Sequence, residues 1–381
     1  MNHLLGGRNL VLDTLSEVYV PLKKYSTHEF WNLAEHTLIP NSVYVIGRKQ
    51  FVENLDIVKR MAESSEYCVV FDNAAEGSWT LISQLQVLKI DDFVIQNKIL
   101  LISGGDLESN YPHIVYEHFL SCITDYEENL QAMKHIDSIF NKIDKPYKFL
   151  FLNGRARPHR KYLYERFKKI NLLEQSLWTM LDSRPSLHRL FQLTEHDINL
   201  MATVSELKRL PPHYEFNFFK NTEVTPGPPE RTFIKPQMFN NLWGEIYLEP
   251  APYVDTYFSL VTETVFEHPC SFRTEKIAKP IAIGHPWIVA ANYGFYKDIR
   301  NLGFKTFSHV IDESFDLINN HQDRMDRIIE IVDDLCKQDL GSFMLACEEV
   351  CKYNQQHLIE VVPKWRSQLP EQFFNLINKY E

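Results

Sequence analysis

The chain lacks an excess of positive charge. Its 381 residues include 40 lysines and arginines against 50 aspartates and glutamates, so the formal net charge is −10. A protein that grips nucleic acid along a whole face is normally basic, so we do not expect nucleic acid as its main partner. A local basic pocket for one small anion is compatible with this balance. With 44% hydrophobic and 24% charged residues, the composition excludes collagen-like, low-complexity and wholly disordered chains.

Long apolar runs are also lacking. No window approaches eighteen consecutive apolar residues, so we predict no membrane span. The opening residues do not show a basic stretch followed by an apolar core, so we expect no secretory signal and a cytoplasmic location. The six cysteines include no Cys-x-x-Cys pair, and we expect them to be reduced, buried thiols.

Motifs for metals and for common cofactors are missing as well. The sequence has no Asp-x-Asp pair and no close group of histidines and cysteines with zinc spacing, so we expect no bound metal. The glycine pairs Gly6-Gly7 and Gly104-Gly105 match neither the dinucleotide-binding fingerprint nor the P-loop.

Short apolar runs alternate with helical patterns along the chain, which is typical of parallel sheets covered by helices. In the first part we predict a helix over 51–61 and another over 136–143, with strands at 42–47, 67–71 and 98–103. In the second part we predict helices over 160–170, 274–283, 293–302, 315–337, 341–360 and 370–380, and strands at 148–152, 257–261, 287–290 and 305–307. Prolines and polar residues over 220–236 predict a loop.

These patterns predict an α/β protein with two Rossmann-like domains that face each other across a cleft, followed by C-terminal helices. Pro146 disfavours a helix at the residue before it, which places a domain boundary near 144–147. We assign 1–145 to an N-terminal domain, 146–360 to a C-terminal domain, and 361–381 to a last helix that is a candidate to pack back on the first domain. In open α/β sheets, ligands bind outside the carboxyl ends of the strands, so the loops after strands hold the candidate site residues.

A basic segment follows the predicted strand at 148–152. Arg155, Arg157, Arg160 and Lys161 lie within seven residues of one another, where a helix is predicted to start. A helix N-terminus presents free N–H groups and a partial positive charge, and the arginine fork matches phosphate oxygens. The segment is therefore a candidate cradle for a diphosphate, and the competing interpretation is a solvated basic loop.

A second polar segment follows the predicted strand at 257–261. Glu263 comes directly after this strand, and Thr274 is a candidate N-cap that places Glu275 and Lys276 in the first turn of a helix. Glu275 suits the helix dipole, whereas Lys276 opposes it, and a bound anion would explain the lysine. The alternative is that Lys276 reaches solvent or pairs with a surface carboxylate.

The residues in these segments resemble a known family of enzymes. YFSLVTET at 257–264, TEK at 274–276 and PIAIGHPWIV at 280–289 are similar to the donor-binding region of GT-B glycosyltransferases, most closely the α1,3-fucosyltransferase family. The turn at 153–160 resembles the strand-to-helix turn of that family whose arginine contacts the nucleotide diphosphate. The family's Phe-Glu-Asn triplet is replaced by Thr-Glu-Thr at 262–264, and the loop that follows is slightly longer.

The resemblance implies that a sugar moves from a nucleotide-sugar donor, with a GDP-sugar as the candidate, to a hydroxyl acceptor such as a glycan. It implies inversion, no metal and no cofactor besides the nucleotide-sugar. Carried over residue by residue, Arg160 would bind the diphosphate, Glu263 would contact the ribose or the sugar, and Glu275 with Lys276 would complete the donor site. Asn153 and Arg157 of the basic turn belong to the same candidate set.

Inverting transfer also needs a general base that deprotonates the acceptor hydroxyl. Asp72 and Glu76 follow the predicted strand at 67–71 and are the first candidates, by preference Glu76. Asp106 and Glu108 in the next loop are reserves. Each of these carboxylates could instead cap a turn.

Two other functions stay open on the sequence alone. A glycosyltransferase that acts on modified bases of DNA would share the fold, although the net charge of −10 argues against it. A non-catalytic module would keep the nucleotide-sugar pocket for recognition and would need no base.

Overall fold

A computed structural model describes residues 26–29, 42–74, 76–77, 81–107, 110–125, 127–155, 157–182, 222–226, 232–236 and 248–377. The chain forms two compact units, one of Met1–Ser121 together with Glu360–Glu381, and one of Cys122–Ile359. Residues 122–145, which the sequence patterns placed in the first domain, therefore belong to the second unit. In the part of the chain that the structure describes, no helix is long and apolar enough to cross a membrane.

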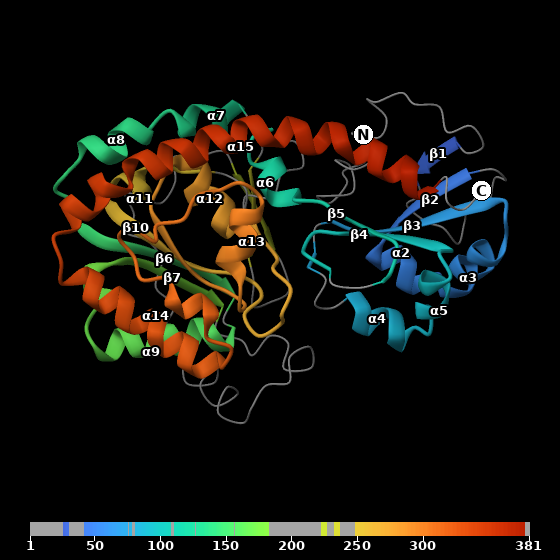
Figure 1. Cartoon of the computed structure of the whole chain (residues 1–381), viewed down its shortest axis with the longest axis horizontal. Helices are drawn as coiled ribbons and strands as arrows, with labels where there is room; N and C mark the ends of the chain where they lie inside the picture. The colour runs from blue at the N-terminus through green and yellow to red at the C-terminus, as the bar shows by residue number, and fades with distance from the viewer. Residues whose placement is uncertain are drawn as a thin grey trace. The chain divides into compact units, whose positions relative to one another are not determined.

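The first unit is built on a parallel sheet of five strands in the order β1-β2-β3-β4-β5 (Figure 1). The strands are β1 (Ser26–Glu29), β2 (Ser42–Gly47), β3 (Tyr67–Asn73), β4 (Ile99–Ser103) and β5 (His113–Val115). Between them lie α2 (Arg48–Glu53), α3 (Leu55–Glu63), α4 (Leu81–Val87) and α5 (Asp91–Ile95), and α6 (His118–Cys122) follows. The three predicted strands are confirmed, whereas the single helix predicted over 51–61 is interrupted at Asn54, whose backbone is not helical.

Side chains of the first sheet alternate between two cores, because successive residues of a strand point to opposite faces. Phe71 of β3 faces the helices α2 to α5 and stacks on Phe51, with 4.1 Å between the ring centroids. The neighbouring Val70 faces the other core, where Phe373 of helix α15 (Leu340–Ile377) is packed. The C-terminal part of α15 therefore covers one face of the first sheet.

The second unit contains a parallel four-stranded sheet in the order β11-β10-β6-β7 (Figure 1). Its strands are β6 (Tyr147–Arg155), β7 (Leu177–Asp182), β10 (Thr256–Thr262) and β11 (Trp287–Ala290). Its helices include α7 (Glu127–Met133), α8 (Ile136–Asn141), α9 (Pro158–Lys169), α11 (Ala251–Val254), α12 (Glu275–Ile283), α13 (Phe295–Asn301) and α14 (His321–Cys336). The predicted strands at 148–152, 257–261 and 287–290 are confirmed.

The strand order of the second sheet reverses between its two central strands. From β6 the chain continues to β7 on one side, and from β10 it continues to β11 on the other side. Loops that leave neighbouring strands in opposite directions separate at the carboxyl ends, which is where open α/β sheets bind ligands. The described strands of the first sheet follow one another in sequential order and show no such reversal.

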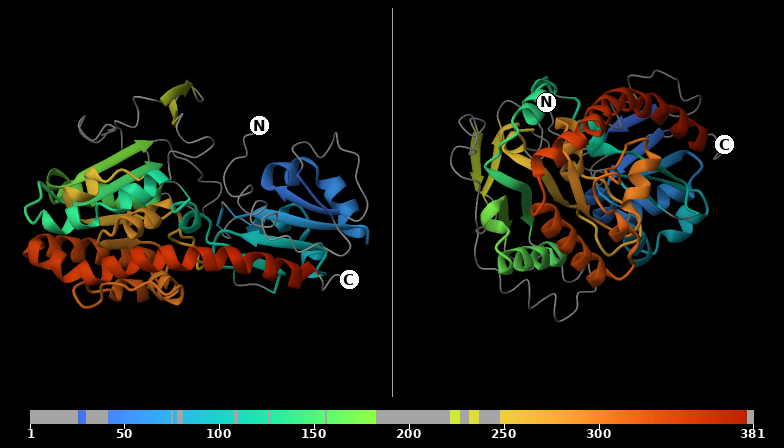
Figure 2. Two further views of the ribbon diagram at one scale, coloured as in Figure 1. Left: turned by 90° about the horizontal axis from the view of Figure 1, so that it is seen from above. Right: turned by 60° about the vertical axis from the view of Figure 1, so that its left-hand side comes forward.

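The structure corrects the predictions for four further elements. Residues 305–307 form no strand, because Asn354 of α15 bonds both the N–H and the carbonyl of Lys305. The helices predicted over 341–360 and 370–380 are one helix, α15, which runs through Pro363 and Pro370. Within the loop predicted over 220–236, β8 (Thr222–Pro226) and β9 (Thr232–Pro236) pair as an antiparallel ribbon, seen as the isolated yellow strands in Figure 2.

Candidate functional site

The basic turn after β6 opens helix α9. Arg157 is the N-cap residue, and Pro158 follows in the first turn, where the missing N–H of proline costs nothing. His159, Arg160 and Lys161 complete a first turn that contains no acidic residue, and all five of these residues are buried. Buried cations at the positive end of a helix repel each other and the dipole. A bound anion would relieve that repulsion.

Arg160 and His159 tie the start of α9 to the end of β10. The Nη2 atom of Arg160 donates to the carbonyl oxygens of Thr262 at 2.9 Å and Glu263 at 3.2 Å. His159 Nε2 lies 3.0 Å from the same Glu263 oxygen, and it must be the donor because a carbonyl only accepts. Burial and the charges of Arg160 and Arg157 hold the pKa of His159 well below its usual value. Arg160, predicted to bind the diphosphate, thus uses Nη2 to bridge two strand-to-helix turns.

Glu263 joins the end of β10 to the start of α12. Its Oε1 accepts from the N–H of Thr274 at 3.0 Å, while its Oε2 accepts from the Thr274 hydroxyl at 2.7 Å and from the N–H of Thr264 at 3.0 Å. Burial raises the pKa of Glu263, and the charge of Lys276 opposes that rise. Its carboxylate, predicted to contact ribose or sugar, therefore holds both ends of the intervening loop.

Lys276 lies in the first turn of α12, as the N-cap prediction for Thr274 required. Its Nζ atom lies 2.5 Å from Glu275 Oε1, 3.1 Å from Thr274 Oγ1 and 3.4 Å from Thr264 Oγ1. Burial alone would raise the pKa of Glu275, but the charges of Lys276 and Lys279 hold it below its usual value. The lysine therefore pairs with its neighbouring carboxylate and reaches Thr264 at the end of β10.

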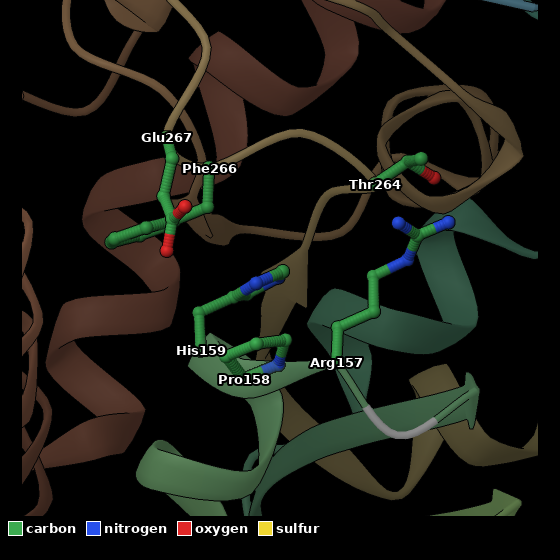
Figure 3. Close-up of a pocket in the computed structure, with 6 residues that line it drawn as sticks. All are labelled: Arg157, Pro158, His159, Thr264, Phe266 and Glu267. Carbon is green, nitrogen blue, oxygen red and sulfur yellow. The ribbon is translucent and has the colours of Figure 1, made fainter. Parts of the chain in front are cut away.

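The two turns meet at a small pocket. It is lined by Arg157, Pro158, His159, Thr264, Phe266 and Glu267 (Figure 3). Figure 3 shows the guanidinium of Arg157 directed at the Thr264 side chain, whose hydroxyl is also the contact of Lys276 Nζ. Cations from the starts of α9 and α12 therefore converge on Thr264, at the carboxyl ends of the two central strands.

A stack of side chains fixes the wall of this pocket. The rings of His159 and Phe266 are 5.0 Å apart and 10° from parallel, and the guanidinium of Arg324 lies 4.4 Å from the Phe266 centroid. Arg324 comes from α14 and donates to the carbonyl oxygens of Phe266 and Ile318, both at 2.7 Å. Burial lowers the pKa of Arg324 to about 10. Arg324 was not among the predicted site residues, because one arginine in an amphipathic helix gives no sign of burial.

Asn153 lies near the end of β6 and is 1% exposed. Its side-chain Oδ1 accepts from the hydroxyl of Thr262 on β10 at 2.6 Å. Its backbone N–H donates to the hydroxyl of Thr179 on β7 at 2.9 Å. Asn153 therefore links the three neighbouring strands just below the start of α9.

The predicted general bases belong to the first unit. Asp72 is buried, and its Oδ1 accepts from the N–H of Ala74 at 2.9 Å. This contact is the one expected if Asp72 caps its own turn. Glu76 has an exposed side chain, and its backbone carbonyl accepts from the N–H of Gly104 at 3.1 Å. Glu108 lies outside the described residues.

The described residues contain no group of three or more histidine, cysteine, aspartate or glutamate side chains that could hold a metal ion. All six cysteines are free and buried. No family model, no curated protein and no solved structure matches this chain. Its function is therefore proposed from the residues of the site and from the resemblance of their segments to a known family.

Proposed function

We propose that the protein is a metal-independent glycosyltransferase whose second unit binds the diphosphate of a nucleotide-sugar between the β6–α9 and β10–α12 turns. The observation that carries this proposal is the convergence of Arg157 and Lys276 on Thr264, where the strand order reverses. Two helix starts and two cations at one strand edge form an environment that favours a multiply charged anion.

The proposed reaction makes direct use of these charges. When the sugar leaves the diphosphate, negative charge grows on the departing oxygen, and fixed cations stabilise that charge in the transition state. The Arg157 guanidinium offers two parallel donors to phosphate oxygens. Arg160 and Glu263 act here as positioning residues, because their hydrogen bonds hold α9 and α12 against β10.

Sugar transfer, inversion and a GT-B pairing of the two units are proposed from the resemblance of the segments at 153–160, 257–264 and 274–276 to the α1,3-fucosyltransferase family. A GT-B enzyme of this kind needs a base for the acceptor hydroxyl. Glu76 is our candidate, because its side chain is exposed in the loop after β3, whereas the Asp72 carboxylate is bonded to the N–H of Ala74.

A second candidate function is a module that binds the nucleotide-sugar without catalysis. The hydrogen bond from Ala74 to Asp72 favours this alternative, because it gives one of the two predicted bases a structural role. Slow release of nucleoside diphosphate from a nucleotide-sugar in the absence of acceptor would favour the transferase. Absence of release from donors that bind would favour the module.

The binding site is tested by calorimetric titration of the wild-type protein with GDP, UDP and their sugars in the presence of EDTA. A ligand of the folded state also raises the melting temperature by mass action. We expect Arg157→Ala to weaken nucleoside diphosphate binding about 10- to 100-fold, the range for losing charge-assisted hydrogen bonds. The control is Lys169→Ala, which removes one exposed charge from the same helix. Equal affinity of the Arg157→Ala and wild-type proteins would refute the phosphate assignment.

A further inference from the structure

We propose that Lys161 is a second phosphate ligand of this site and that, together with the side-chain amide of Asn153, it receives phosphoryl oxygens on the β7 side of the α9 start. This inference rests on the proposed function, because it assigns a further part of the same diphosphate site. Lys161 belongs to the basic segment predicted as a diphosphate cradle, where it was not assigned to a particular phosphoryl group.

The ammonium of Lys161 is enclosed and has no acceptor. The residue is 0% exposed, and within the described chain no atom accepts a hydrogen bond from its Nζ. Burial lowers the pKa of Lys161 to about 8, against the charge of Glu165. An ammonium that is buried without a partner is strongly unfavourable, and native proteins tolerate such a group mainly where it has a use.

A second buried donor, on the strand that leads into α9, is also unsatisfied. Asn153 is 1% exposed, and its Nδ2 has no hydrogen-bond partner among the described residues. The other arm of this amide, Oδ1, is bonded to Thr262 on β10. Phe151, two positions earlier on β6, packs against Phe167 of α9, so Asn153 lies on the face of the sheet that α9 covers.

Helix geometry places Lys161 on the β7 side of α9. Lys161 lies in the first turn of α9, so its side chain leans towards the start of the helix. Tyr164, three positions after Lys161, packs edge-on against Trp178 of β7 with 5.1 Å between the rings. The face that carries Lys161 therefore looks towards β7.

What these donors lack is an anionic acceptor. Lys161 Nζ and Asn153 Nδ2 can only donate, and one of them is a cation, so their missing partner carries negative charge and several acceptor oxygens. A diphosphate has acceptor oxygens on two phosphorus atoms. We expect one phosphoryl group to meet Arg157, Thr264 and Lys276, and the other to meet Asn153 and Lys161.

The test measures the affinity of the full chain for inorganic pyrophosphate and for GDP by calorimetry, together with the melting temperature of the unliganded protein. We expect Lys161→Met to weaken binding of both probes about 10- to 100-fold. We expect the same variant to raise the melting temperature without ligand, because an apolar side chain replaces a buried, unpaired charge. If the role of Lys161 were purely structural, Lys161→Met would lower the melting temperature as well as the affinity. The control is Lys169→Met on the exposed side of the same helix, which should leave both unchanged.

The outcomes of this test separate the role of Lys161 from the proposed function. Unchanged affinity in Lys161→Met, with wild-type binding intact, would overturn the role of Lys161 and leave the proposed function standing. Absence of binding of both probes to the wild-type protein would overturn the proposed function and this inference together. If Lys161→Met does not fold, Lys161→Gln decides in its place: a loss of affinity supports the role, and unchanged affinity refutes it.

Discussion

Buried polar residues of the second unit differ in whether the fold supplies their hydrogen-bond partners. His285 is 1% exposed, and both of its ring nitrogens are bonded: Nδ1 lies 2.9 Å from Ser259 Oγ and Nε2 lies 2.8 Å from the Thr256 carbonyl. Lys161 is equally buried but has no acceptor in the described chain. The histidine is thus explained as a core residue that fastens β10, whereas the lysine is explained only by something that binds beside it.

His285 leads to a prediction about acid stability. Burial lowers its pKa to about 3, from 6.5. Between these values the unfolded chain takes up a proton that the folded chain refuses, so this group's contribution to stability is present above pH 6.5 and is lost as the pH falls towards 3. We expect His285→Leu to be less stable at pH 7, by about 1–3 kcal/mol for the hydrogen bonds lost, but to lose less stability on acidification.

The measurement is the change in melting temperature between pH 7 and pH 5 for the wild-type protein, His285→Leu and a control. His309→Leu replaces an exposed histidine and should keep the wild-type pH dependence. An acid-induced decrease in His285→Leu as large as that of the wild-type protein would contradict this account of the histidine.

Helices and loops of the site are held by contacts that are distant in sequence. The place of Lys276 was predictable, because an N-cap threonine and the residues that follow it form a local pattern. The carbonyl partners of Arg160 lie 102 and 103 residues away, and the Phe266 partner of Arg324 lies 58 residues away. No local pattern encodes such pairs. The sequence therefore predicted the charged residues at the site but not which of them form hydrogen bonds within the fold.

Arg324 provides the prediction at the scale of elements, because it fastens the loop after β10 to helix α14. Arg324→Ala removes hydrogen bonds to three backbone segments, including those at Phe266 and Ala291, and leaves their buried carbonyls unsatisfied. Each buried carbonyl left unsatisfied costs about 1–3 kcal/mol, so we expect a loss of about 3–5 kcal/mol in the free energy of unfolding, measured by denaturant titration.

Arg327 on the same helix supplies the matched control. It pairs with Asp312 and Glu330 at the surface, so Arg327→Ala should cost about 0–1 kcal/mol. Weakened GDP binding by folded Arg324→Ala at low temperature would further show that the loop at Thr264 depends on α14. Equal stability losses in the two variants would contradict the proposed difference between them.

At the scale of the whole molecule, the sheets were predictable from the sequence, whereas the unit boundary and the extent of helix α15 were not. Alternating strands and helices predicted parallel sheets in both units, because each element carries its own periodicity. The boundary at Ser121 and the continuous helix α15 were not predicted, because Pro363 and Pro370 indicated an interruption. Packing of Phe373 and its neighbours on the first sheet stabilises the last turns enough to accommodate these prolines.

The membership of residues 360–381 in the first unit leads to the last prediction. Phe373 is 1% exposed and belongs to the same core as Val70 and Leu100 of β3 and β4, so Phe373→Ala should destabilise the first unit by about 3–5 kcal/mol. Hydrogen exchange followed by mass spectrometry should show faster exchange in β3 and β4, with β6 and β10 unchanged. Leu345→Ala, at an exposed position earlier on the same helix, should leave the exchange rates of all four strands unchanged. Equally faster exchange in β6 and β10 would mean that the two units unfold as one, against the division that their contacts indicate.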